Sequence, residues 1–160
     1  MEQVDEARKK AKKYITIADR MLTQTFAMLQ DPKLLIAVIE NIFLAVANEI
    51  SALMHYEKAI KKIRDVDEDF NKLIEKFKER SEKLGLKEYN AFITEIKKLR
   101  YGHKKADVEF SRKEMYVICS DDYDDCKVVS EEKLKSFIKT AKMFIQKAEE
   151  PILKNEGLFG

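Results

Sequence analysis

Hydrophobic residues near the start of the chain recur every three or four positions, which is the spacing of one face of an α-helix. This stripe and the set beside it consist of Val4, Ala7, Ala11, Tyr14, Ala18 and Met21, joined by Ile15, Leu22, Phe26 and Leu29. We therefore predict a first helix over residues 3–30. Asp31 and Pro32 follow it, and because Asp caps helices and Pro suits the first helical turn, a second helix should begin immediately.

The second helix is predicted to run to about Arg64 and to pack antiparallel to the first. A helix of roughly 30 residues spans roughly 45 Å, which is long enough to form the spine of a domain. Acidic residues at 65–70 favour a third helix start, and Gly85 suits its end. Hydrophobic residues at helical spacing line the third and fourth helices, namely Phe70, Leu73, Ile74, Phe77 and Leu84, then Tyr89, Phe92, Ile93, Ile96 and Leu99. The fourth helix should reach residues 100–105, although Gly102 leaves its end open.

From Val108 the hydrophobic period changes to two, which is typical of strands. Two short β-branched runs, "MYVICS" and "CKVVS", flank the acidic stretch "DDYDD", so we predict a small hairpin there. Ser130 then caps a last helix that Pro151 should end. The predicted fold class is all-α: a single-domain antiparallel helical bundle of about five helices, with the β-hairpin inserted before the last. The domain is expected at 3–150, with a C-terminal tail at 151–160 that either docks or stays loose.

Composition favours this class. Of the 160 residues, 38% are charged and only four are Gly and two are Pro, which is a balance typical of helical globular proteins and similar to that of thermophile proteins. The net charge of +2 is too small to indicate a nucleic-acid-binding protein. The first residues are acidic at Glu2, Asp5 and Glu6 and lack an apolar signal core, so we expect a cytoplasmic location.

One stretch, "LLIAVIENIFLAVANEISALM" at 34–54, raises the question of a membrane span. Glu40, Asn41, Asn48 and Glu49 interrupt it. Each carboxylate near a bilayer centre would cost roughly a few kcal/mol, which offsets several leucines. We therefore interpret the stretch as a helix buried on most sides within the bundle, and we expect no membrane contact.

The charges are unevenly distributed along the chain. Residues 97–105 contain five basic residues and no acid, namely Lys97, Lys98, Arg100, Lys104 and Lys105, whereas 106–126 contain seven acids against Arg112 and Lys113. A second basic cluster, at 8–13, reads as a solvated helix face. Arg100 and His103 share a helix face at i and i+3 and flank the predicted buried side. They are either a chemical site or basic groups that stabilise a helix C-terminus, and the second interpretation is favoured.

Two further sets of residues leave alternatives open. Asn41, Asn48, His55 and Lys62 lie seven apart, so they form either a polar ladder in the core or, as we favour, the solvent edge of the helix. Cys119 and Cys126 face each other across the hairpin in one register and point to opposite faces in another. They are either a disulfide or free thiols, and free thiols are the cytosolic expectation. We predict no metal site and no cofactor.

Long first and second helices, a spine rich in Ala and Asn, and an Arg-to-His segment near the end of a later helix resemble the HEPN superfamily of helical domains. The resemblance covers residues 3–105 and the last helix. In that family, an Arg, four to six residues and a His contribute to metal-independent RNA cleavage across a dimer. In this chain "RYGH" has only two residues between them. Other members of the family are non-catalytic partners of nucleotidyltransferases.

The sequence therefore supports two hypotheses. In the favoured one, the protein is a non-catalytic interaction module whose exposed stripe or hairpin meets a second copy or another protein. In the alternative, it cleaves or binds RNA: His103 transfers a proton, Arg100 stabilises phosphate charge, and Lys97, Lys98, Lys104 and Lys105 hold the RNA backbone.

Overall fold

A computed structural model describes the backbone of residues 1–105, 108–112, 115–119 and 126–159; within these ranges, the side chains of 103–105, 108–112 and 156–159 are not described. The chain is mostly helical, as predicted. Its helices are α1 (Glu2–Arg20), the π-helical segment η1 (Met21–Phe26), α2 (Ala27–Leu29), α3 (Leu34–Ala59), α4 (Phe70–Arg80), the 3-10 turn η2 (Lys87–Tyr89), α5 (Asn90–Lys105) and α6 (Glu131–Phe159).

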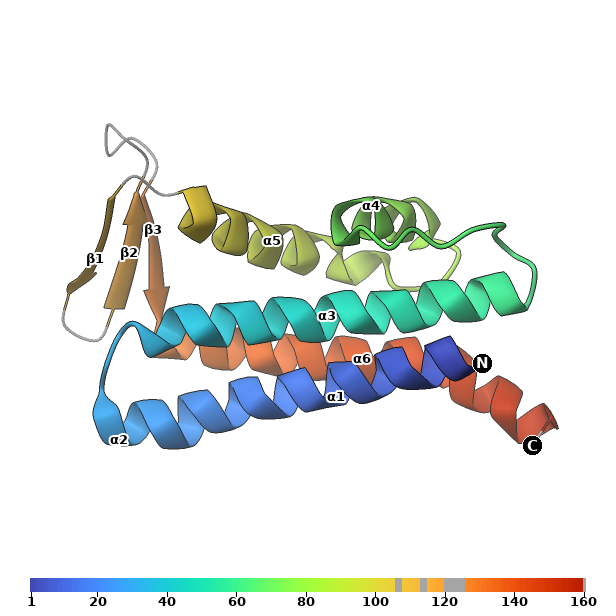
Figure 1. Cartoon of the computed structure of the whole chain (residues 1–160), viewed down its shortest axis with the longest axis horizontal. Helices are drawn as coiled ribbons and strands as arrows, with labels where there is room; N and C mark the ends of the chain where they lie inside the picture. The colour runs from blue at the N-terminus through green and yellow to red at the C-terminus, as the bar shows by residue number, and fades with distance from the viewer. Residues whose placement is uncertain (106–107, 113–114, 120–125, 160) are drawn as a thin grey trace.

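The long helices lie roughly along one axis, and α3 is at their centre (Figure 1). Helix α1 runs antiparallel to α3, as the sequence predicts, and α6 lies against both (Figure 1). Helices α4 and α5 cover another side of α3. Helix α3 is therefore enclosed by its neighbours over most of its surface, which explains why it is apolar nearly all round.

The predicted hairpin is present, and a third strand extends it. Strands β1 (Val108–Arg112), β2 (Met115–Cys119) and β3 (Cys126–Ser130) form an antiparallel sheet in the order β1-β2-β3. Strand β1 was not predicted as a separate strand, although the period of two was predicted to begin at its first residue, Val108. The acidic turn predicted between the two runs lies outside the described residues.

The alternation along β2 and β3 gives the sheet an inner and an outer face. Tyr116 and Ile118 on β2 are buried, and Val129, which pairs with Tyr116, is buried beside them. Met115 and Val128 lie on the other face and are 40% and 44% exposed. The sheet lies at one end of the helices (Figure 1), and its outer face presents Met115 and Val128 to the surroundings.

Local side-chain chemistry sets several helix ends. Asp69 accepts a hydrogen bond from the backbone N–H of Asn71 at 3.0 Å and caps α4, and Ser130 caps α6 by accepting from Lys133 N–H at 3.2 Å. Gly85 takes a positive φ of 71° just after α4, as predicted for a helix stop. The prediction that the second helix runs to Arg64 is wrong, because Lys61 turns left-handed at φ 64° and α3 ends at Ala59.

The prediction that Pro151 ends the last helix is also wrong. Helix α6 continues through Pro151 to Phe159. Proline costs one backbone hydrogen bond in a helix interior and kinks it. Ala148 and Ile152 are fully buried on either side, so packing holds the helix against the core across the proline. Helix α6 changes direction near this end (Figure 1).

The segment η1 widens the N-terminal helix by one π-helical turn. Leu22 and Phe26 within it are fully buried, so the stripe that begins at Val4 still faces the core after the wide turn. Thr23 donates a hydrogen bond from Oγ1 to the carbonyl oxygen of Asp19 at 2.7 Å. This bond supplies a partner to a carbonyl near the junction of the two helix types.

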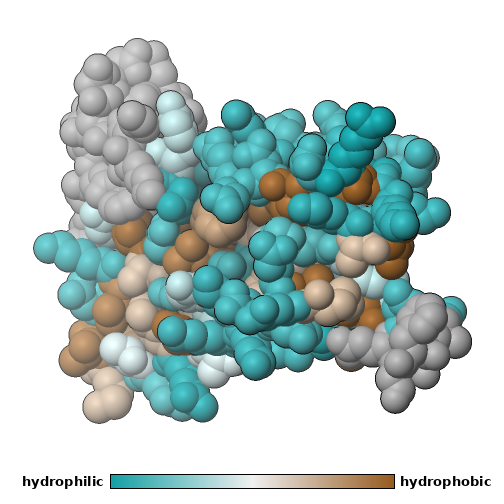
Figure 2. Space-filling view, turned by 45° about the vertical axis from the view of Figure 1, so that its right-hand side comes forward, coloured by the Kyte–Doolittle hydropathy of each residue, from teal (hydrophilic) through white to brown (hydrophobic). Residues whose placement is uncertain are grey.

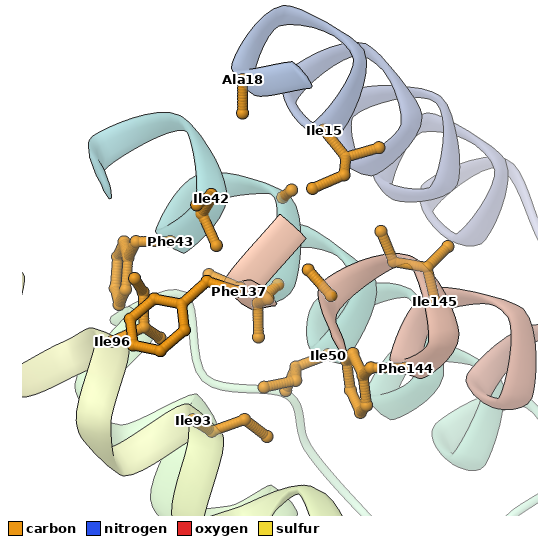
Figure 3. Packing of buried hydrophobic residues seen from close by; sticks show 14 of the residues in the cluster. Ile15, Ala18, Ile42, Phe43, Ile50, Ile93, Ile96, Phe137, Phe144 and Ile145 are labelled. Atoms are coloured by element: carbon orange, nitrogen blue, oxygen red, sulfur yellow. The ribbon is translucent and has the colours of Figure 1, made fainter. Parts of the chain in front are cut away.

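Aromatic and branched side chains from the helices meet in the core, part of which Figure 3 shows. Phe144 of α6 lies edge-to-face with Phe77 and with Tyr89, with ring centroids 5.7 Å and 5.3 Å away. Phe137 packs in the same way on Phe92 at 5.5 Å. These contacts join α6 to α4, η2 and α5.

Candidate functional site

Arg100 lies on α5 and is bound to α3. Its Nε and Nη2 donate to the two carboxylate oxygens of Glu40 at 2.7 Å and 3.1 Å, and its guanidinium lies 4.3 Å from the ring centroid of Phe43. The arginine side chain is 26% exposed. Arg100 thus lies at the edge of the buried side, as predicted, but its charge is balanced by a carboxylate and one planar face is covered by a ring.

The other basic residues of this segment are only partly described. Lys97 is half-buried, and its Nζ is 3.8 Å from Glu75 on α4, whereas Lys98 is exposed. Helix α5 continues to Lys105, so Arg100 and His103 do share one helix at i and i+3. The side chains of His103, Lys104 and Lys105 lie outside the described residues.

The polar residues spaced seven apart on α3 are bonded within their own helix. Asn41 and Asn48 each donate from Nδ2 to the carbonyl four residues earlier, at 2.8 Å and 2.7 Å. His55 is partly buried, and burial followed by the charge of Lys58 lowers its pKa below 6.5. Lys62 is exposed. This arrangement fits the edge of a helix, although Asn48 itself is buried.

Two buried carboxylates on α3 were missed as site residues. Glu49 is fully buried where α3 faces α1 and α6, and burial raises its pKa to about 8, with the negative charge of Glu149 adding to the effect. Glu57 is 4% exposed and binds Arg80 of α4, with Glu57 Oε2 3.2 Å from Arg80 Nη2. The sequence carried a signal for Glu49, because it lies seven residues after Ile42 and three before Ala52 on the apolar side of the helix.

A groove of about 790 Å³ lies between the end of α3, the 60–69 loop, α4 and Lys97 of α5. Its floor is apolar and includes Met54 and Leu73. Acidic residues predominate on its rim, namely Asp65, Asp67, Glu68, Glu75 and Glu79, with Lys72, Lys76 and Lys97 among them. On the face that Figure 2 shows, hydrophobic residues lie between hydrophilic ones.

Cys119 and Cys126 form a disulfide that joins β2 to β3. They are direct partners in the strand register, with Cα atoms 4.1 Å apart, so the expectation of free thiols is not met. Among the residues that the structure describes, no group of three or more His, Cys, Asp or Glu could hold a metal ion.

Comparisons with protein-family models, with curated proteins and with solved structures give no match to this chain. Within the described ranges, α3 alone is long and apolar enough to cross a membrane, and 61% of its most apolar window is buried among the other helices. The core helix of a folded domain has the same length and apolar composition, so these two properties do not by themselves indicate a membrane span.

Proposed function

We propose that the chain is a non-catalytic interaction module, a single-domain antiparallel helical bundle of HEPN-like type that associates with a second copy of itself. The contacts that Arg100 makes with Glu40 and Phe43 are the main support for a non-catalytic role. A guanidinium that stabilises a developing phosphate charge must present free donors to the substrate. In this chain Glu40 accepts hydrogen bonds from two of the guanidinium nitrogens, and the ring of Phe43 covers one face of the guanidinium.

Exposed apolar side chains at one end of the molecule supply the surface for association. Met28 and Leu29 on α2 are 83% and 64% exposed, and Met115 and Val128 lie on the outer face of the sheet at the same end (Figures 1 and 2). Burying such side chains is favourable by roughly 25 cal/mol for each Å² removed from water. A second copy that presents the same end would cover both patches. A nucleotidyltransferase is the alternative partner that the HEPN resemblance implies.

The oligomeric state tests this proposal. We expect sedimentation equilibrium to show a reversible dimer, and Leu29→Lys to weaken it by at least about tenfold because the substitution places a charge in an apolar contact. Leu153→Lys is the matched control, since Leu153 is 49% exposed near the opposite end of α6. A wild-type protein that stays monomeric at about 100 μM would refute self-association.

RNA binding is the second candidate function, and the exposed Lys98 among the basic residues of α5 favours it. The test is to incubate single-stranded and hairpin RNA with the protein in EDTA. Metal-independent cleavage that is lost in both Arg100→Ala and His103→Ala would establish catalysis and refute the proposal above. Binding without cleavage, weakened by salt, would indicate an electrostatic surface. Arg64→Ala, at an exposed arginine outside α5, is the control.

A further inference from the structure

Among the ionisable groups that the structure describes, Glu49 has the most unusual surroundings. It is fully buried on α3, and neither of its carboxyl oxygens has a hydrogen-bond partner among the described residues. An ionised carboxylate in such a place has lost its water without gaining donors, which is costly. A protonated carboxyl avoids most of this cost. The surroundings of Glu49 therefore favour its neutral form.

The charged groups that face Glu49 come from the two helices packed against α3. Glu149 of α6 contributes a like charge, and Arg8 and Lys12 of α1 contribute opposite ones. Both cations form ion pairs with Glu149, because Arg8 Nε and Lys12 Nζ lie 3.0 Å and 3.3 Å from the same oxygen, Oε1. Burial outweighs them and raises the pKa of Glu49 from 4.5 to about 8.

Helix α1 buries little apolar volume for its length. Of its 19 residues, those that are buried are Val4, Ala7, Ala11, Ile15 and Ala18, and three of the five are alanines. Alanine side chains bring the backbones of α1 and α3 close together but contribute little burial energy each. The ion pairs of Arg8 and Lys12 with Glu149, and that of Asp19 with Lys142, also join α1 to α6, but Lys12, Asp19 and Lys142 are partly exposed, so the pairs of these residues add only modestly to the attachment.

We propose that the proton on Glu49 is a latch for α1: while Glu49 keeps its proton, α1 stays packed on α3 and α6, and when the proton is lost α1 separates from them. Separation admits water to Glu49 and lets it ionise without the cost of burial. The O–H bond of the carboxyl breaks, its electron pair stays on the carboxylate oxygen, and the proton passes to water. The latch is independent of whether the protein associates with itself or with RNA.

The direction of the pH effect follows from linkage. The closed state holds the proton up to a pKa of about 8, whereas the opened state releases it near the ordinary value of 4.5. Between these values the opened state binds fewer protons, so each unit of pH favours opening about tenfold, and above pH 8 the effect levels off. The latch is thus closed in acid and loosened as pH rises through neutrality.

Hydrogen–deuterium exchange of the full chain tests the latch. Protection factors, corrected for the intrinsic pH dependence of exchange, are measured in unit steps from about pH 5 to about pH 8 for α1, α4 and α5. We expect protection in α1 to fall by about tenfold per unit while α4 and α5 keep theirs. Glu49→Gln, which cannot ionise, should remove this dependence.

Two further variants keep the outcome interpretable. Glu49→Leu also lacks a proton to lose and leaves no buried amide, so it serves if the Gln variant folds poorly. Glu40→Gln makes the same chemical change on the same helix, at a carboxylate that faces α5, and should keep the wild-type dependence in α1. Protection of α1 that does not vary with pH, or that falls equally in α4 and α5, would overturn the latch.

Discussion

The buried ion pair between Glu57 of α3 and Arg80 of α4 allows a sharp test of how these two helices are held together. Glu57 is 4% exposed, and its side chain lies 3.2 Å from Arg80 Nη2. Arg80 Nε is buried without a hydrogen-bond partner among the described residues. The pair is therefore incompletely satisfied, and a buried pair of that kind is often worth no more than apolar residues of similar size. Removing only one partner is a different matter.

Breaking a fully buried pair by losing one member costs about 3–5 kcal/mol, because the other charge is left buried alone. The arginine side chain is 18% exposed and the glutamate side chain 5%, so a lone arginine can reach water more easily than a lone glutamate. We expect Glu57→Leu to cost about 2–3 kcal/mol and Arg80→Met about 3–4 kcal/mol. The double variant should cost no more than about 1 kcal/mol, since both charges are gone.

Urea unfolding followed by far-UV circular dichroism measures all four proteins of this double-mutant cycle. Lys83→Met, at an exposed lysine between α4 and Gly85, controls for the loss of a surface cation and should change stability by less than about 0.5 kcal/mol. If the double variant lost as much stability as the two single variants together, Glu57 and Arg80 would not be coupled, and the argument from burial would be refuted.

Three other predictions concern the core and the glycines. Phe144→Ala should lower the unfolding free energy by about 3–5 kcal/mol in the same urea assay, because it removes a fully buried ring with two edge-to-face contacts, and a loss below about 1 kcal/mol would contradict that packing. Ile42→Asp should cost several kcal/mol because it buries an unpaired carboxylate on the fully enclosed side of α3, and an unchanged thermal melt would show that this side is open. Gly102→Ala should stabilise α5 by about 0.5–1 kcal/mol, since the added carbon meets only Ile118 at 3.9 Å. Gly85→Ala should instead destabilise the protein, because φ is positive there. Changes in unfolding free energy of the same sign for the two variants would refute this reasoning.

The helices could be predicted from the sequence because their periodicity is a local property. The stripe from Val4 to Met21 and the capping role of Ser130 need only neighbouring residues to be recognised. The ends that were wrong depend on distant contacts. Pro151 normally ends a helix, and the burial of Ile152 against the core overrides that local preference.

The candidate site was harder to predict for the same reason. Arg100 was singled out from its spacing to His103, but its partner Glu40 is sixty positions away and nothing in the local pattern joins them. Glu49 was recognised only as an interruption of an apolar run. Its position on the buried side of α3 could be read from the spacing, but the approach of Glu149 from the far end of the chain could not.

The π-helical turn at η1 affects where the protein can gain or lose a residue without disturbing its core. From Val4 to Phe26 the buried positions span six helical turns in 22 residues, whereas six turns of α-helix take about 21.6, so a plain helix would drift by about 40° over this distance. The π-helical turn absorbs that drift. An insertion or deletion of one codon elsewhere in α1 would rotate every later side chain by about 100° and expose the apolar stripe. In η1, just after α1, the helix already departs from α-helical winding, so a change of one residue is most easily accommodated there.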